Sequence, residues 1–358
     1  MRFLTNFVAF LLIVLSNFVC WAGENTQKTA HIYVDLASIP ALLQMVDAVK
    51  QPADDPKLFI WKRFHTLPPD DLTLKELNGT MPDAKSLGEQ NYDLFIDFVD
   101  EHVTDFYQKY PDYMFVIHLN LFHSKNRSGH IFDIIPEKQI QSVHLYEDAI
   151  GRSYWDGGTE RTFLAFNETS APKYLHFGGF VSKQLSLTEN QLILEDFQEI
   201  EKTLSVKQKS QIAKFVGFDS SQLSQIYLKR PTAVFLDDPS LTVEKAEMFL
   251  EKLMKDKRLK TYTWLYKNHP RVSEKTEVFE LLNKLFPTVL PLPNAMPLES
   301  LILCGYRPTY IAGYGSSVFF SFKAEQILGY IKRNYLETYL HPLLELGILT
   351  PEKVFPSV

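Results

Sequence analysis

Short β-type runs alternate with segments of helical period along most of the chain, and this alternation limits the fold more than any other feature. The runs that start at His31, Leu58 and Met114 are rich in β-branched and aromatic residues. Between them, apolar residues recur at three- and four-residue steps, as on one face of a helix. Strands separated by helices pair in parallel, with right-handed crossovers. The chain is therefore expected to be an α/β protein.

The alternation occurs in two blocks on either side of a polar stretch. In the first block we expect strands at 31–35, 58–61, 114–121 and 143–146, with helices at 38–49 and 92–110. In the second we expect strands at 232–236, 262–266 and 310–313 (the last), with helices at 243–255 (capped by Thr242), 274–285 (capped by Ser273) and 299–303. The stretch 189–225 between the blocks shows no clear strand signal and is expected to be largely helical.

The length fits two packed domains better than one core, since the chain has 358 residues. We expect two Rossmann-like domains that face each other across a cleft, over residues 23–205 and 206–358. Whether the last helix packs back on the first domain is left open. Ligands of open α/β sheets bind at the carboxyl ends of the strands, so candidate residues are sought there.

The N-terminal residues 1–22 have the pattern of a secretory signal peptide. A basic start precedes a short apolar run and a small residue, Ala22, at a plausible cleavage point. The protein is therefore expected to be exported (periplasmic or secreted), or anchored to a membrane if the segment is not cleaved. Cleavage would leave Cys304 as the one cysteine, so no disulfide within the chain is expected.

Charge and motif content exclude several classes of function. The net charge is −6 and the basic residues are scattered, whereas a nucleic-acid-binding face needs them concentrated. The acidic pairs at 54–55, 70–71 and 237–238 are interpreted as turns. No HExxH motif or cysteine cluster occurs in the sequence. We therefore expect no metal and no other cofactor.

Polar residues at the ends of two expected strands could bind a phosphate. The glycine-rich turn after the strand at 310–313 leads through Ser316 and Ser317 into a helix, which offers hydroxyls and free N–H groups. Lys267 and His269 follow the strand at 262–266 and could meet the same anion. Pro270 biases His269 toward an extended conformation. Taken singly, each of these residues is also typical of an ordinary turn or helix cap.

Three further residues complete a possible transferase site. Glu299 could accept hydrogen bonds from ribose hydroxyls. Asp148, at a strand end of the opposite domain, is a candidate general base, with His123 able to tune it. This layout suits an inverting transfer from a nucleotide sugar, in which the base takes the proton of an acceptor hydroxyl and an acid neutralises the leaving phosphate.

The segments that carry these residues resemble, in the same order and with similar spacing, the bacterial sialyltransferases of glycosyltransferase family 80. That family has two Rossmann domains in the GT-B arrangement. The similar segments are HIYVDLASIPALLQMVD, IHLNLFHS, HLYEDA, YKNHPR, LPNAMPLESLILCGYRPTYIAGYGSSVFFSF and LGILTPEKVF. Together they extend over about residues 31–355.

The resemblance implies a metal-independent, inverting transfer of sialic acid from CMP-sialic acid to a hydroxyl of a galactose-type glycan or glycolipid. The residue roles it implies are Asp148 as general base, His269 as general acid, Ser316 and Ser317 at the phosphate, Lys267, Pro270 and Glu299 around the cytidine, His123 beside the donor sugar, and Asp35 and Arg63 toward the acceptor.

The sequence departs from the family pattern at three places, and these keep alternatives open. Ala149 and Asn268 replace glycines, and the segment 237–240 replaces a Thr/Gly-rich loop that carries a mobile tryptophan. The donor could instead be another CMP-linked nonulosonate or Kdo. The chain could also be a catalytically weak, secreted sugar- or nucleotide-binding protein. Hydrolysis has less weight, because the adjacent Glu147 and Asp148 would point to opposite faces of a strand.

Overall fold

The computed structural model describes fourteen segments of the chain: residues 27–35, 38–61, 76–77, 92–121, 130–147, 158–178, 191–216, 221, 224, 231–269, 276–286, 289–293, 296–332 and 339–355. Within these segments, no helix combines the length and the hydrophobicity that a membrane span requires.

The elements alternate along the chain as expected. The α-helices are α2 (Ser38–Lys50), α3 (Tyr92–Lys109), α5 (Ile131–Ile134), α7 (Gly158–Leu164), α8 (Phe197–Thr203), α9 (Val206–Phe215), α11 (Val243–Leu253), α12 (Glu277–Leu285), α13 (Glu299–Leu303) and α14 (Leu340–Glu345). The strands are β1 (Thr29–Asp35), β2 (Lys57–Trp61), β3 (Glu76–Leu77), β4 (Met114–Asn120), β5 (Ile140–Tyr146), β6 (Lys173–Gly178), β7 (Leu192–Glu195), β8 (Thr232–Leu236), β9 (Thr263–Lys267), β10 (Leu290–Pro291), β11 (Tyr310–Tyr314), β12 (Ile327–Ile331) and β13 (Val354–Phe355). Short 3-10 helices are η1 (Glu137–Gln139), η2 (Lys257–Thr261), η3 (Ser317–Ser321), η4 (Ala324–Gln326) and η5 (Pro351–Lys353).

The strands form two separate sheets, and every pairing among the described strands is parallel. The first sheet has the order β3-β2-β1-β4-β5-β6-β7, and the second has the order β10-β9-β8-β11-β12-β13. In both, the order reverses beside the first strand of the block, between β1 and β4 and between β8 and β11. These are the switch points at which such sheets bind ligands. The prediction of two Rossmann-like domains is confirmed.

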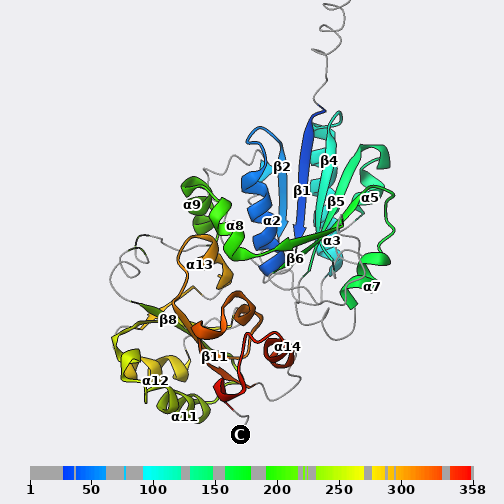
Figure 1. Ribbon diagram of the computed structural model, residues 1–358. Helices are drawn as coiled ribbons and strands as arrows, with labels where there is room; N and C mark the ends of the chain where they lie inside the picture. Colours follow the sequence, from blue (N-terminus) through cyan, green and yellow to red (C-terminus); the bar gives the residue numbers. More distant parts are fainter. Residues whose placement is uncertain are drawn as a thin grey trace, which may run out of the picture.

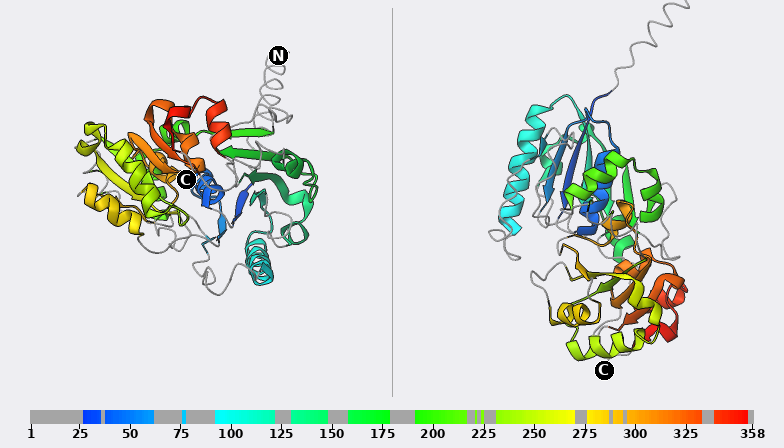
Figure 2. Two further views of the ribbon diagram at one scale, coloured as in Figure 1. Left: turned by 90° about the horizontal axis from the view of Figure 1, so that it is seen from below. Right: turned by 90° about the vertical axis from the view of Figure 1, so that its left-hand side faces the viewer.

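Helices cover both faces of the first sheet, so its strands are buried on both sides. Ile32 and Val34 of β1 pack in one apolar cluster with Val99 and Val103 of α3. Tyr33, which points to the opposite face, packs in a second cluster with residues of α2. Figure 2 shows α3 and α2 on opposite sides of the sheet. This two-sided burial explains why the strands read as apolar runs in the sequence.

Helices α8 and α9 connect the two sheets and contact both domains. Gln208 on α9 donates a hydrogen bond to the Val49 carbonyl on α2 (2.8 Å), and Gln198 on α8 donates one to the Ser321 carbonyl of the second domain (2.9 Å). Figure 1 shows α8, α9 and α13 grouped where the domains meet. Buried residues of α2, α9, α13 and α14 form one continuous apolar cluster. The boundary between residues 205 and 206 stays a prediction; Ser205 caps α9 there.

Two statements about strands were wrong. The stretch 189–225 contains β7, whose Leu192 pairs with Leu175 of β6, a strand that was also not predicted. The strand at 310–313 is not the last, because β12 and β13 follow it. β7 and β13 have four and two residues, and they lie at sheet edges. Such short strands exist through pairing with partners elsewhere in the chain, which local periodicity does not reveal.

The predicted cap of α12 was also wrong. The helix begins at Glu277, and Thr276 caps it by accepting a hydrogen bond from the Phe279 N–H (3.3 Å). The Thr276 hydroxyl donates in turn to the Asp237 carboxylate at the end of β8 (2.5 Å). This tertiary contact favours Thr276 over Ser273, which lies outside the described residues.

Gly313 in β11 is a position where a side chain would disrupt the second sheet. Its φ is +121°, and an added Cβ would overlap the backbone of Leu236 on β8, 2.6 Å from its amide nitrogen. We expect Gly313→Ala to destabilise the fold by about 2–4 kcal/mol, measured by urea unfolding. Gly347→Ala is the matched control, because φ there is +66° but nothing lies within 4 Å; it should cost about 1 kcal/mol. Equal losses for the two variants would contradict the overlap.

Candidate active site

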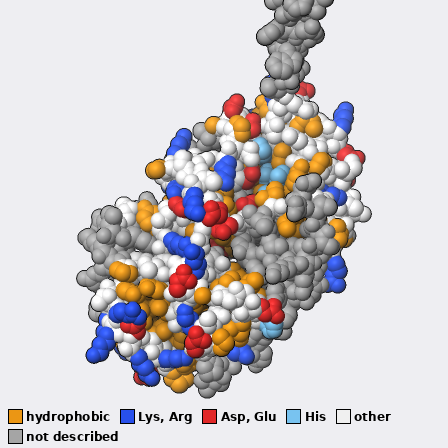
Figure 3. Space-filling view, viewed as in Figure 1, with side chains coloured by type: hydrophobic (Ala, Val, Ile, Leu, Met, Phe, Trp, Pro, Cys, Tyr) orange, Lys and Arg blue, Asp and Glu red, His pale blue; other side chains and the backbone are white. Residues whose placement is uncertain are grey.

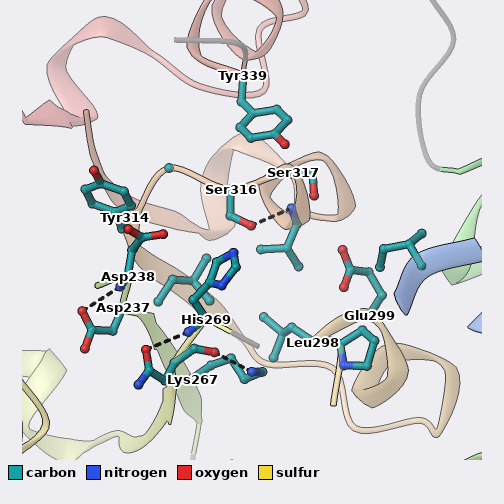
Figure 4. Close-up of a pocket in the computed structure, with 16 residues that line it drawn as sticks. Asp237, Asp238, Lys267, His269, Leu298, Glu299, Tyr314, Ser316, Ser317 and Tyr339 are labelled. Carbon is teal, nitrogen blue, oxygen red and sulfur yellow. Dashed lines mark hydrogen bonds between the residues drawn. The ribbon is translucent and has the colours of Figure 1, made fainter. Parts of the chain in front are cut away.

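A cavity of about 200 Å³ lies at the carboxyl ends of β8, β9 and β11 in the second domain, and it also touches the first domain. Figure 4 shows the residues around it. They are Ile39, Leu236, Asp237, Asp238, Lys267, Asn268, His269, Pro297, Leu298, Glu299, Tyr314, Gly315, Ser316, Ser317, Val318 and Tyr339. The cavity therefore brings together five residues predicted from three separate segments of the sequence: Lys267, His269, Glu299, Ser316 and Ser317.

The turn after β11 presents two hydroxyls to this cavity. Ser316 caps η3 and accepts a hydrogen bond from the Val318 N–H (3.5 Å), and Ser317 is the first residue of that helix. Both side chains are half-buried. Figure 4 shows Ser316 and Ser317 on the side of the cavity that the His269 ring faces. Their hydroxyls can donate hydrogen bonds to an anion held there.

His269 follows β9 and is half-buried. Its backbone N–H donates to the Oδ1 atom of Asn268 (2.8 Å), and the Asn268 side chain is itself buried. The Asn268 side chain therefore stabilises the start of the turn that carries His269. The resembled family has a glycine at this position. The ring nitrogens of the imidazole can donate a hydrogen bond to a ligand in the cavity.

Lys267 and Glu299 are two buried residues of opposite charge type that also line the cavity. Burial lowers the pKa of Lys267 to about 8, and the nearby Glu299 carboxylate opposes that shift. Burial raises the pKa of Glu299 to about 7, and hydrogen bonding and Lys267 oppose that shift. The Lys267 ammonium donates to the Asn268 carbonyl (2.5 Å). Burial of ionisable groups beside a cavity is common at functional sites, because each can exchange its protein partner for a ligand.

The acidic pair after β8 also lines the cavity, but Asp237 is turned away from it. Its carboxylate accepts hydrogen bonds from the hydroxyls of Tyr266 (2.6 Å) and Thr276 (2.5 Å). Burial raises the pKa of Asp237, and these hydrogen bonds oppose the shift. The carboxylate of Asp238 accepts from Ser240. The interpretation of 237–238 as a turn is confirmed, and the buried member of the pair serves the packing of β8 against α12.

Asp35, predicted to face the acceptor, lies buried at the carboxyl end of β1 and is not part of the cavity lining. Its carboxylate accepts hydrogen bonds from Gln44 (3.1 Å) and Asn120 (3.3 Å). At the end of β5, which β4 separates from β1, Glu147 is buried too. Four other predicted site residues lie outside the described part of the chain: Asp148, Pro270, His123 and Arg63.

Eleven of the sixteen lining residues were not predicted as site residues, and three of these come from places of interest. Ile39 comes from the first turn of α2 in the first domain, and Tyr339 precedes α14. Tyr314 ends β11, and its hydroxyl bonds to the Ser240 hydroxyl (2.6 Å). Nothing local marks Ile39 or Tyr339, since an isoleucine and a tyrosine usually serve packing. Tyr314 lies between the two glycines of a turn already singled out, and that position was the available signal.

No protein-family model matches this sequence, and a comparison with curated proteins gives no match. Solved structures do match over most of the chain. An α/β-galactoside α-2,3-sialyltransferase from Photobacterium phosphoreum is 18% identical with a TM-score of 0.65, covering 91% of this chain and 98% of that one. The GT-B domain of a Photobacterium damselae sialyltransferase is 17% identical with a TM-score of 0.62, covering 91% and 99%.

A third solved structure is a 2,6-sialyltransferase from a Photobacterium species in a ternary complex with the donor product CMP and the acceptor substrate lactose. It is 18% identical with a TM-score of 0.61, covering 91% of this chain and 78% of that one. At this level of identity the likeness shows the fold, and the chain has the GT-B arrangement of two Rossmann-like domains that the resemblance implied.

Proposed function

We propose that this protein is a glycosyltransferase that moves sialic acid from CMP-sialic acid to a hydroxyl of a galactose-type glycan. One observation carries the proposal: Lys267, His269, Glu299, Ser316 and Ser317, chosen from separate segments, line a single cavity. The shared fold supports it, because one neighbour with this architecture holds CMP and lactose. The cavity offers hydroxyls and an imidazole for a phosphate, and a buried lysine and glutamate for a nucleoside.

The proposed reaction is a single displacement with inversion. Asp148 removes the proton from the acceptor hydroxyl, and that oxygen attacks the anomeric carbon of the donor. The bond from this carbon to the phosphate oxygen breaks, and His269 donates a proton to the departing phosphate. Ser316 and Ser317 hold the phosphate by hydrogen bonds throughout. Because CMP carries one phosphate, these groups can stabilise the leaving group without a metal ion.

The test is a panel of donors with the purified protein. CMP-sialic acid, CMP-Kdo and a UDP-sugar are each incubated with and without lactose, and released nucleotide and glycan product are measured. CMP release that depends on lactose and on CMP-sialic acid is expected, with the same rate in excess EDTA and an inverted anomeric configuration by NMR. Faster transfer from CMP-Kdo would redirect the donor assignment, and nucleotide release from no donor would refute the enzyme proposal.

A second candidate, a sugar- or nucleotide-binding protein with little catalysis, is favoured by one feature of the cavity. The acidic segment that includes Asp238 stands where the resembled family has a loop with a mobile tryptophan, and it lines the cavity. A binding protein would take up CMP in a calorimetric titration while releasing none from any donor. That pair of results separates the two candidates.

Cytidine binding should depend on pH through the buried Glu299 and Lys267. The ionised form of Glu299 accepts hydrogen bonds from ribose hydroxyls, and its pKa is about 7. The affinity should therefore fall as the pH drops through 7, by about tenfold between pH 7.5 and 6. Protonated Lys267, with a pKa of about 8, adds a decline above pH 8. Calorimetry with cytidine is the measurement, because this nucleoside has no phosphate that titrates in the range.

The variant Glu299→Gln should abolish the acidic limb of that profile and leave the alkaline limb. Glu277→Gln, at an exposed position in the first turn of α12, is the control and should keep both limbs. An acidic limb that survives in Glu299→Gln would assign the titration to another group.

We also propose that the protein is exported or held at a membrane by residues 1–22, which lie outside the described residues. Cell fractionation followed by N-terminal sequencing of the purified protein tests this. A mature chain that starts near Gly23 is expected for export, and an intact start in the membrane fraction is expected for an anchor. An intact chain in the soluble cytoplasmic fraction would contradict both.

A further inference from the structure

A row of buried and half-buried histidines crosses the first sheet on the face that α2 covers, and none of them lines the cavity described above. His31 lies on β1, His118 on β4, His144 on β5 and His176 on β6. Register places His118 beside His144, and His176 beside Tyr146. His31 and His118 are 4% and 1% exposed. Burying polar rings in a core is costly unless each ring atom is satisfied, and in this row the His31 Nε2 atom has no hydrogen-bond partner.

Three donor atoms converge at one end of the row. One donor atom from each of His31, His118 and Asp47 lies within 4.8 Å of one from each of the other two. The Nε2 atom of His118 is 3.3 Å from Nδ1 of His31 and 3.6 Å from Oδ2 of Asp47. Ligands bound to zinc at about 2.0–2.1 Å in a tetrahedron are separated by about 3.3–3.4 Å. These two separations are therefore close to the edges of a zinc coordination sphere.

The surrounding groups orient these donors as outer partners orient metal ligands. The His118 Nδ1 atom is 3.0 Å from the Tyr146 hydroxyl, which can accept its proton and leave Nε2 with a free lone pair. Asp47 accepts hydrogen bonds from the Tyr33 hydroxyl (2.8 Å) and from Gln51 (3.0 Å). Each interaction fixes a ring tautomer or a carboxylate orientation, as a preformed site requires.

The second ring nitrogen of His31, Nε2, also lies near a group that could orient the ring. Its Nε2 atom is buried without a hydrogen-bond partner, and the nearest carboxylate oxygen, Oδ2 of Asp55, is 3.6 Å away. A metal ion on Nδ1 would place the ring proton on Nε2, where it faces Asp55. This is the carboxylate–histidine–metal relation common at such sites.

The charged side chains near the cluster are negative in sum, which favours the binding of a divalent cation. Asp47 and Asp55 supply two negative charges, and the buried Lys57 ammonium supplies one positive charge while it donates to the Pro52 and Asp55 carbonyls (2.5 and 3.0 Å). Burial lowers the pKa of His31, and burial together with neighbouring histidines holds the pKa of His118 well below its usual value. The neutral imidazole is the form of histidine that binds metals.

We propose that His31, His118 and Asp47 form a binding site for a divalent metal ion of the zinc type, with a fourth position open to water. Two imidazoles and one carboxylate are ligands that zinc accepts. Asp47 lies eight residues after Ile39 on α2, a rise of about 12 Å, so the site is remote from the cavity. The ion would tie β1, β4 and α2 together, and the site does not depend on the proposed transferase activity.

The test uses the full chain, without a histidine tag and stripped of metal by a chelator. Zinc titrated by calorimetry should bind with one equivalent, and cobalt should give the intense visible absorption of four-coordinate geometry. At a free zinc concentration of about 100 times Kd, the Tm should rise by about 5 °C. X-ray absorption of the zinc-loaded protein should show two imidazole ligands. The proposal would be overturned if the protein bound no zinc, or if the X-ray absorption spectrum showed no imidazole ligands.

Variants locate the bound ion. Asp47→Asn keeps an acceptor for the Tyr33 hydroxyl and should weaken zinc binding by at least about 100-fold, as should His118→Gln. Asp100→Asn is the matched control, because Asp100 pairs with the exposed His130 (2.6 Å) elsewhere in the same domain, and it should bind zinc as the parent does. Unchanged affinity in both Asp47→Asn and His118→Gln would also overturn the site. If either variant fails to fold, the ligand count from the parent protein decides.

Discussion

Replacing His269 by asparagine is expected to lower kcat for sialyl transfer by about 10²–10⁴-fold, while CMP still binds within about tenfold of the parent affinity. The reason is a difference in role: His269 supplies a proton to the leaving phosphate, whereas Ser316, Ser317 and the Lys267–Glu299 pair hold the nucleotide. Steady-state kinetics with CMP-sialic acid and lactose give kcat, and calorimetry gives the dissociation constant of CMP.

The split between kcat and binding is the decisive part of this result. His341→Asn is the control, since His341 is exposed on α14 and pairs with Glu345 (3.1 Å), and it should retain the parent kinetics. If His269→Asn kept the parent kcat, another group would be the acid. If it lost CMP binding altogether, the imidazole would be a binding residue and not the proton donor.

Replacing Asp148 by asparagine is expected to reduce kcat by a similar factor, about 10²–10⁴, with no change in the dissociation constant of CMP. Asp148 follows Glu147, whose N–H donates to the His176 carbonyl (3.0 Å) and extends the pairing of β5 with β6 to its carboxyl end. Glu147, the residue before the predicted base, therefore lies at the sheet edge where ligands of this fold bind. Without a base, the acceptor hydroxyl keeps its proton in the transition state.

A second variant controls for the loss of one negative charge from the first domain. Asp112→Asn removes an exposed carboxylate from the same domain, in the turn before β4, and should leave kcat unchanged. Donor hydrolysis without lactose is measured alongside, because water is activated by the same base and should slow in parallel. An Asp148→Asn enzyme with the parent kcat would disprove the assignment of the base.

The strands with a strong local signal were predicted from the sequence, and those toward the last edge of each sheet were not. The apolar runs of β8, β9 and β11 and the cap of α11 by Thr242 were visible because each depends on neighbouring residues; Thr242 accepts a hydrogen bond from Lys245 only three residues later (3.3 Å). β7, β12 and β13 were not predicted, because pairing with distant strands stabilises them. The cap of α12 was misplaced for the same reason, since Thr276 is held by Asp237 from another strand.

The residues chosen at strand ends of the second domain do line one cavity. Some of this proximity could be predicted from the sequence, and some could not. Parallel strands with right-handed crossovers place their carboxyl ends on one edge of the sheet, so Lys267 and Ser316 were expected at the same edge. The pairing of Lys267 with Glu299 was not implied, because Glu299 begins a helix whose docking depends on the cluster shared by both domains. Ile39 lines the cavity because the same packing brings α2 of the first domain next to the second domain.

The sequence by itself determined the alternation of strands and helices, the parallel sheets and the identity of five cavity residues, because periodicity and turn chemistry are local properties. The tertiary structure alone decided which charges are buried together and which histidines meet. His31 and His118 are 87 residues apart, and they come within 3.3 Å because β1 and β4 are adjacent in a sheet whose order differs from the chain order. Strand order is a property of the whole packed domain, so no local pattern carries it.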